Sequence, residues 1–131
     1  AVSRFVRDAA KMGRRPLSGL IARSHRNMHG IVNLEGQHLG HGLYPVASFF
    51  NHSCAPNCVV SFHGPKLRVH TICPVPQGAE LTIAYIELYA PRAWRHQQLM
   101  SSKGFECACP RCSLPPTDPS EAGLTEGGDG A

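Results

Sequence analysis

Alternation of apolar and polar residues is clearest between residues 58 and 88. Three apolar, β-branched runs follow one another there, separated by turn-forming residues at 63–65 and at 74–78. In the second run, "LRVHTI", apolar and polar side chains alternate, so that the two kinds face opposite sides of a strand. Such runs, joined by Gly- and Pro-containing turns, are typical of an antiparallel meander. The pattern predicts a small antiparallel sheet.

Helical patterns flank this region on both sides. Residues 2–26 predict one or two short helices, broken at "GRRPLSG" (residues 13–19) by glycine and proline. Residues 90–104 predict a helix with Pro91 in its first turn and Gly104 at its end. The glycine-rich segment 30–50 suits short strands and loops. We therefore expect a mainly β protein with short helices, of the α+β class.

The tail from Leu114 consists mainly of Pro, Gly and acidic residues, with little to bury, and is predicted to be disordered. The chain of 131 residues is about one domain in length. It has no apolar run of roughly 18 residues, and its first residues do not form an apolar secretory signal. We expect a soluble protein without a membrane partner. The chain does not start with Met, so we also expect it to be part of a longer product.

The formal net charge of +4 is unevenly distributed. Basic residues crowd the first 26 positions, whereas the tail after Arg111 carries only acids. A basic arm can attract nucleic acid or an acidic partner. The same spacing also suits the solvated face of an amphipathic helix. We favour the helix because no aromatic residue except Phe5 is interleaved with the bases; nucleic acid stays open as an alternative partner.

Six cysteines without a secretory signal favour a reducing compartment, the cytoplasm or the nucleus. Three of them form the compact series Cys107-x-Cys109-x-x-Cys112, which is better suited to converge on one metal ion than to form disulfides. A structural zinc site needs a fourth ligand. Cys54 is the best candidate because it lies in a polar turn, whereas Cys58 and Cys73 border apolar strands and are expected in the core. The alternative is a redox pair or unligated thiols.

Three segments, "GLYPVASFFNHSCAPNC", "GAELTIAYIELY" and "GFECACPRC", occur in an order and spacing that resembles a known family. It is the C-terminal half of the SET domain with its post-SET cysteine motif, of the SET and MYND (SMYD-type) protein-lysine methyltransferases. The resemblance runs from about Asn27 to Cys112. It implies small curved sheets with a pseudoknot and a C-terminal zinc knot, in a partial domain.

The resemblance also implies a cofactor, a reaction and roles for individual residues. S-adenosyl-L-methionine would donate a methyl group to a lysine of a protein substrate, a histone tail or another protein. Tyr85 matches the catalytic tyrosine at the reaction centre. The positions that match cofactor-binding residues are Asn27, Asn51, His52, Tyr85 and Phe105. The positions that match ligands of a structural Zn²⁺ are Cys54, Cys107, Cys109 and Cys112.

Two features depart from the family pattern. Lys103 lies two residues before Phe105, where related enzymes often carry an aromatic residue of the lysine channel. The family's Gly-x-Gly turn and MYND zinc finger do not match any segment, so we expect a fragment that lacks the Gly-x-Gly half. A non-catalytic, zinc-stabilised protein-interaction module is the alternative function. The expected organisation is a helical insert end (1–26), the second SET half (27–90), a helix with the zinc motif (91–113) and the acidic tail (114–131).

Overall fold

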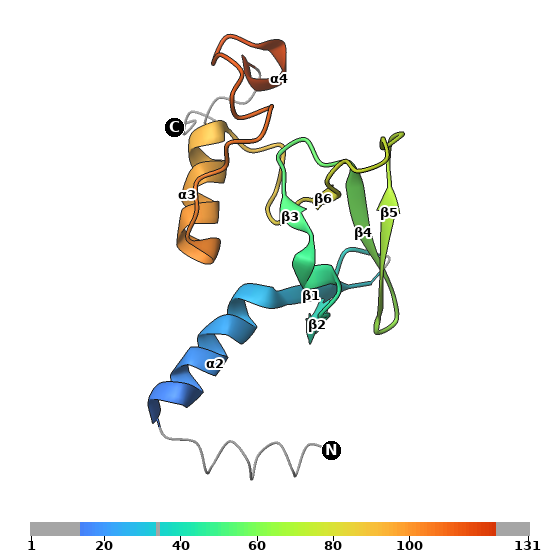
Figure 1. Ribbon diagram of the computed structural model, residues 1–131, viewed down its shortest axis with the longest axis vertical. Helices are drawn as coiled ribbons and strands as arrows, with labels where there is room; N and C mark the ends of the chain where they lie inside the picture. Colours follow the sequence, from blue (N-terminus) through green and yellow to red (C-terminus); the bar gives the residue numbers. More distant parts are fainter. Residues whose placement is uncertain (1–13, 34, 123–131) are drawn as a thin grey trace. The chain divides into compact units, whose positions relative to one another are not determined.

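The structure, a computed structural model, describes residues 14–33 and 35–122 (Figure 1). The chain divides into two compact units, residues 1–48 and residues 49–131. Each unit is described by itself below. Within the described residues, no helix is both long enough and apolar enough to cross a membrane.

The first unit contains one helix followed by a two-stranded hairpin. Helix α2 (Arg14–Asn27) leads directly into β1 (Met28–Val32), which pairs antiparallel with β2 (His38–Leu43). In the loop between the strands, the Asn33 side-chain oxygen accepts hydrogen bonds from the backbone N–H groups of residues 35 and 37, at 3.1 and 2.8 Å. The short strands expected from the glycine-rich segment are confirmed. A 3₁₀ turn, η1 (Ala47–Phe49), follows at the junction of the units.

Helix α2 differs from the predicted break at residues 13–19. It begins at Arg14 and continues through Pro16 and Gly19. Proline is tolerated in a first turn because its missing N–H would lack an intrahelical partner there anyway. A single internal glycine costs only about 1 kcal/mol relative to alanine, which does not end a helix. Residues 1–13, the other part of the predicted helical region, lie outside the described residues.

The second unit contains the predicted hairpin. Strand β4 (Cys58–His63) pairs antiparallel with β5 (Lys66–Thr71) (Figure 1). This pairing places Val60 opposite Val69 and Phe62 opposite Leu67. All four side chains are partly buried, while their polar neighbours are exposed. The two-residue turn starts with Gly64 at φ 56°, the backbone conformation that a type II′ turn requires at its first central position.

The third apolar run does not extend this hairpin, so the predicted three-stranded meander is wrong. Only β6 (Thr82–Ile83) forms a strand there, and it pairs in parallel with β3 (Asn51–His52). Asn57 stabilises this arrangement. Its side-chain oxygen accepts the Thr82 N–H at 2.8 Å, and its side-chain amide donates to the Glu80 carbonyl at 2.8 Å. The segment that leads to Tyr85 is thereby held beside the Asn-His strand.

Helix α3 (Arg92–Lys103) lies within the predicted range of residues 90–104. Pro91 immediately precedes the helix rather than lying within its first turn as predicted, and Gly104 ends it as predicted, with a left-handed φ of 81°. The Gly104 N–H bonds to the carbonyls of Leu99 and Met100, both at 3.0 Å, which satisfies acceptors at the helix end. Arg95 and Leu99, one turn apart, form its buried face.

The tail differs from the prediction of disorder over residues 114–122. A short helix, α4 (Pro119–Ala122), follows two turns, and its Glu121 is buried. Residues 123–131, the rest of the predicted disordered tail, lie outside the described residues. The tail therefore contributes an acidic side chain to the interior of the second unit.

Cysteines take the place of large apolar residues in the core of the second unit. The central cluster consists of Leu99 with Cys54, Cys107 and Cys112. Partly buried side chains pack around it: Tyr85, Ile86, Leu88, Phe105 and Cys109. Cys58 is buried in β4, as expected, but Cys73 is exposed after β5, so its predicted core position is wrong. So small an apolar core leaves the unit in need of another stabilising element.

Candidate zinc site and reaction centre

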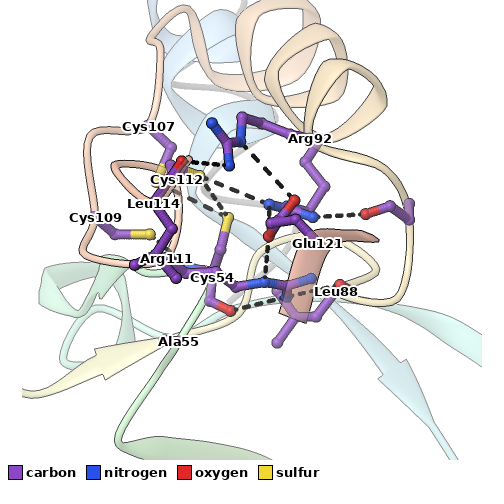
Figure 2. A network of polar contacts seen from close by, with 12 residues as sticks. Cys54, Ala55, Leu88, Arg92, Cys107, Cys109, Arg111, Cys112, Leu114 and Glu121 are labelled. Atoms are coloured by element: carbon purple, nitrogen blue, oxygen red, sulfur yellow. Dashed lines mark hydrogen bonds and ion pairs between the residues drawn. The ribbon is translucent and has the colours of Figure 1, made fainter. Parts of the chain in front are cut away.

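Four cysteine sulfurs converge at one point of the second unit. Cys54 comes from the turn after β3, and Cys107, Cys109 and Cys112 come from the segment after α3. All four sulfur atoms lie within 4.8 Å of one another (Figure 2). The structure thus brings together the four predicted ligands, although Cys107 lies 53 positions after Cys54 in the sequence.

The spacing of the sulfurs fits a zinc ion. A tetrahedral site with Zn–S bonds of about 2.3 Å places its sulfurs about 3.8 Å apart. The Cys54 sulfur lies 3.5 Å from that of Cys112 and 3.9 Å from that of Cys107. Three of the four residues are buried. If zinc is bound here, four cysteine ligands would make the site a structural one, because no ligand position would be left open for a substrate.

The thiols are held in unequal environments. Burial raises the pKa of the Cys54 thiol, and its hydrogen bond with Cys112 raises it further. Burial also raises the pKa of Cys109, but hydrogen bonds from the backbone N–H groups of Cys112 and Cys54 outweigh this effect and lower it to about 6. The Cys54 N–H lies 3.3 Å from the Cys109 sulfur. The backbone of one ligand therefore stabilises the thiolate of another.

A buried ionic network lies against the cysteine cluster, and the sequence analysis missed it. The Arg95 side chain has no exposed surface, and its Nη2 lies 2.8 Å from Glu121 Oε1. The same carboxylate oxygen accepts the Arg111 Nε–H at 2.7 Å. Arg95 Nη2 also lies 3.9 Å from the Cys112 sulfur. If zinc is bound, this positive charge would offset part of the negative charge of the four cysteine thiolates.

Arg111 connects this network to the polypeptide around the site. Its Nη1 donates to the Cys54 carbonyl at 3.2 Å and to the Leu88 carbonyl at 2.8 Å (Figure 2). Arg92 donates to the Leu114 carbonyl at 2.8 Å. In the sequence, Arg95 lies one helical turn before Leu99 and so on the same face of α3, the face that is buried. This spacing is the signal by which a buried arginine could have been found.

His52, Tyr85 and Phe105 form a second group directly beside the cysteines. The ring centroid of His52 lies 5.4 Å from that of Tyr85 and 6.3 Å from that of Phe105. The Tyr85 hydroxyl donates a short hydrogen bond to the Phe50 carbonyl. Burial raises the pKa of Tyr85, so its hydroxyl is neutral at pH 7. The structure thus brings together three of the five residues predicted to bind the cofactor.

The two asparagines have other surroundings. The Asn51 side chain is exposed, and its amide donates to Glu80 Oε1 at 2.6 Å. Asn27 belongs to the first unit, where it ends α2, and its amide donates to the Arg23 carbonyl at 2.7 Å. Each of these side-chain amides therefore already has a hydrogen-bond partner within its own unit.

Lys103 brings a positive charge to the ring of Tyr85. Its Nζ lies 5.1 Å from the centroid of the Tyr85 ring, within the range of a cation–π interaction. Burial lowers the pKa of Lys103. The ammonium therefore points towards Tyr85, the arrangement in which it would repel an incoming cation.

Comparison with known proteins identifies the family. Residues 8–86, more than half of the chain, match the SET domain. The chain belongs to the SET domain family. This result confirms the resemblance inferred from the three sequence segments.

The curated relatives place the chain near the SET and MYND methyltransferases. It is 41% identical over 92 residues to the mouse histone-lysine N-methyltransferase SMYD3, covering 70% of this chain and 22% of that protein. It is 34% identical over 102 residues to N-lysine methyltransferase SMYD2-A of Xenopus laevis, covering 78% and 24%. For histone-lysine N-methyltransferase ASHR1 of Arabidopsis thaliana the identity is 36%, covering 77% and 22%. The chain spans less than a quarter of the length of these relatives.

Proposed function

We propose that this chain forms the zinc-bound, tyrosine-bearing part of an S-adenosylmethionine-dependent protein-lysine N-methyltransferase. The observation that carries the proposal is the position of Tyr85. Its hydroxyl is fixed on the Phe50 carbonyl, and its ring packs beside His52 and against the four-cysteine cluster. The names of the mouse, frog and plant relatives support lysine as the methyl acceptor.

Zinc would be held by Cys54, Cys107, Cys109 and Cys112 in this proposal. Its contribution is structural, because four thiolates complete its coordination. The ion would fix the segment that carries Phe105 to the turn that follows Asn51 and His52. In this way it would hold the reaction centre together without taking part in the reaction.

When bound, S-adenosylmethionine supplies a methyl group activated by a sulfonium cation. The acceptor lysine must be neutral to attack, and its reference pKa of about 10.4 leaves almost none neutral at pH 7. Desolvation beside a cation lowers that pKa, so a strong protein base is not needed. The Tyr85 hydroxyl donates a hydrogen bond to the Phe50 carbonyl. The lone pairs of the hydroxyl oxygen are then left to accept an N–H of the amine. Tyr85 would therefore orient the lysine nitrogen.

Cofactor binding is the first test of the proposal. We expect the zinc-loaded 131-residue chain to bind S-adenosylmethionine in a one-to-one complex in isothermal titration calorimetry. Phe105→Ala should weaken binding by about tenfold, because an aromatic contact is worth about 0.5–1.5 kcal/mol beyond its buried area. A folded, zinc-loaded chain that gives no binding heat would contradict the proposal for this chain and favour the non-catalytic module.

Tyr85 can be tested separately from cofactor binding. With core histones as the acceptor and radiolabelled S-adenosylmethionine, Tyr85→Phe should lower methyl transfer by about 100-fold, the usual effect of removing one oriented polar group from a reaction centre. Cofactor affinity should change little. The matched control is Tyr89→Phe, because Tyr89 is 85% exposed and lies four residues further along. Equal activities of the two variants would remove Tyr85 from the reaction.

One observation favours the alternative, a non-catalytic zinc-stabilised interaction module. The Lys103 ammonium lies over the ring of Tyr85, where a substrate ammonium would meet a like charge. Cofactor binding without methyl transfer to any protein lysine, in the wild type and in Lys103→Tyr alike, would support this alternative.

A further inference from the structure

The imidazole of His52 uses both of its nitrogens inside the protein. Nδ1 lies 3.1 Å from the backbone nitrogen of Tyr85, and Nε2 lies 3.3 Å from the sulfur of Cys54. The ring is thus placed between a candidate zinc ligand and the proposed reaction centre. Neither nitrogen is left for a cofactor.

The partners of the ring determine its tautomer. A backbone N–H can only donate, so Nδ1 must accept the Tyr85 N–H. A neutral imidazole with an acceptor at Nδ1 carries its proton on Nε2, which points to the Cys54 sulfur. The second contact is therefore an N–H···S hydrogen bond. It is strengthened when the sulfur is a metal-bound thiolate, because the acceptor is then charged.

We propose that His52 is a positioning residue that couples occupancy of the zinc site to the position of Tyr85. This inference rests on the proposed function. It assigns the His52 ring to positioning the Tyr85 backbone relative to Cys54, whereas the family resemblance implied a cofactor contact. A zinc-bound Cys54 thiolate would fix the ring through Nε2, and the fixed ring would hold the Tyr85 backbone through Nδ1. The Tyr85 hydroxyl returns to the Phe50 carbonyl, two residues before His52, and so closes a ring of contacts.

Neighbouring backbone contacts make this link stiff. β3 and β6 place His52 beside Ile83, and the Ser53 N–H donates to the Ile83 carbonyl at 3.1 Å. The short segment from Ile83 to Tyr85 therefore cannot move away from His52 without breaking several hydrogen bonds. A change in ring position at His52 is transmitted to Tyr85 rather than absorbed by a flexible loop.

Two substitutions separate the two contacts. The side-chain oxygen of His52→Asn can replace Nδ1 as acceptor but cannot reach Cys54, whereas the amide of His52→Gln can reach Cys54 but does not reproduce the Nδ1 acceptor. On the zinc-loaded full chain, we would measure zinc release to a chromophoric chelator and the hydrogen-exchange protection of the Tyr85 amide. His52→Asn should release zinc about tenfold faster with Tyr85 protection retained, since second-sphere partners typically contribute tenfold or more to metal affinity. His52→Gln should keep the release rate within about threefold and lose about tenfold in protection.

The wild-type protein gives an independent readout. The ¹⁵N chemical shifts of the His52 ring should report protonation at Nε2 in the zinc-loaded chain. His70→Asn, at an exposed position of β5, is the control and should leave both release and protection unchanged. Protonation at Nδ1, or equal effects of His52→Asn and His52→Gln on both measurements, would overturn the coupling. A chain that binds no zinc would instead overturn the zinc site, and one that binds zinc but no S-adenosylmethionine would overturn the proposed function while leaving the His52 measurements decisive.

Discussion

Replacing Cys112 with serine is expected to reduce bound zinc from one ion per chain to almost none and to unfold the second unit at room temperature. Binding of a structural zinc ion is worth roughly 10–16 kcal/mol in zinc-finger peptides at pH 7. The whole net stability of a small domain is only about 5–15 kcal/mol. Because the core of this unit is built largely from its cysteines, little other burial remains to stabilise it without the ion. Metal content by mass spectrometry and far-UV circular dichroism would measure both effects.

The chain provides a matched control for this experiment. Cys73→Ser removes an exposed thiol outside the cluster and should leave zinc content and thermal unfolding unchanged. A chelator added to the wild type should reproduce the Cys112→Ser spectrum, and zinc should reverse the change. Retention of one tightly held zinc ion by Cys112→Ser would show that the site is not built from these four cysteines.

Replacing Glu121 with glutamine is expected to lower the free energy of unfolding by about 3–5 kcal/mol, the usual cost of removing one partner from a buried ion pair. The Glu121 side chain is 5% exposed, and its carboxylate bonds to Arg95 and Arg111. Its loss leaves the fully buried Arg95 without its anion. Urea unfolding of the zinc-loaded protein, followed by tryptophan fluorescence, would measure the change in midpoint.

Lowering the pH should also lower the free energy of unfolding, because it protonates Glu121. Burial alone would raise the pKa of Glu121, but Arg95 and Arg111 outweigh it and lower the pKa below its ordinary value. The stabilising contribution is therefore present above the ordinary carboxyl pKa and is lost as the pH falls through the folded-state value.

Glu106→Gln is the control for the buried pair. Glu106 also pairs with a basic side chain, His96 at 3.1 Å, but its own side chain is 71% exposed. An exposed pair contributes about 0–1 kcal/mol, so this substitution should hardly move the urea midpoint. If Glu121→Gln were as mild as Glu106→Gln, the buried network would have no role in stability.

Local signals in the sequence were sufficient for some parts of the fold. Helix α3 followed from a proline at its start, a glycine at its end and the residues between them. The β4–β5 hairpin followed from alternation and a Gly-Pro turn. The ligand set followed from the compact spacing of three cysteines and the polar surroundings of Cys54. The helix, the hairpin and the three-cysteine series are each determined by residues that are close together in the sequence, whereas Cys54 lies 53 positions before Cys107.

Other parts depend on contacts between distant residues, and there the predictions failed or were not made. The parallel pairing of β6 with β3 depends on Asn57 bonding to Thr82, which no local pattern indicates. The composition of the tail predicts disorder because it offers little to bury, yet Glu121 is buried through its ion pair with Arg95. The apolar neighbours of Cys73 predict a core position, but strand β5 ends at Thr71, two residues before it.

The distance along the chain between Cys54 and the other three cysteines bears on the order of events during synthesis. The four-cysteine site closes a loop of more than 50 residues, and both the hairpin and Tyr85 lie inside that loop. On a ribosome, Tyr85 leaves the exit tunnel before Cys107, Cys109 and Cys112. Closing so long a loop costs entropy that only the completed site repays. The four-cysteine site can therefore be completed only after Cys112 has emerged, so we expect metal capture to follow formation of the sheets if the site binds zinc.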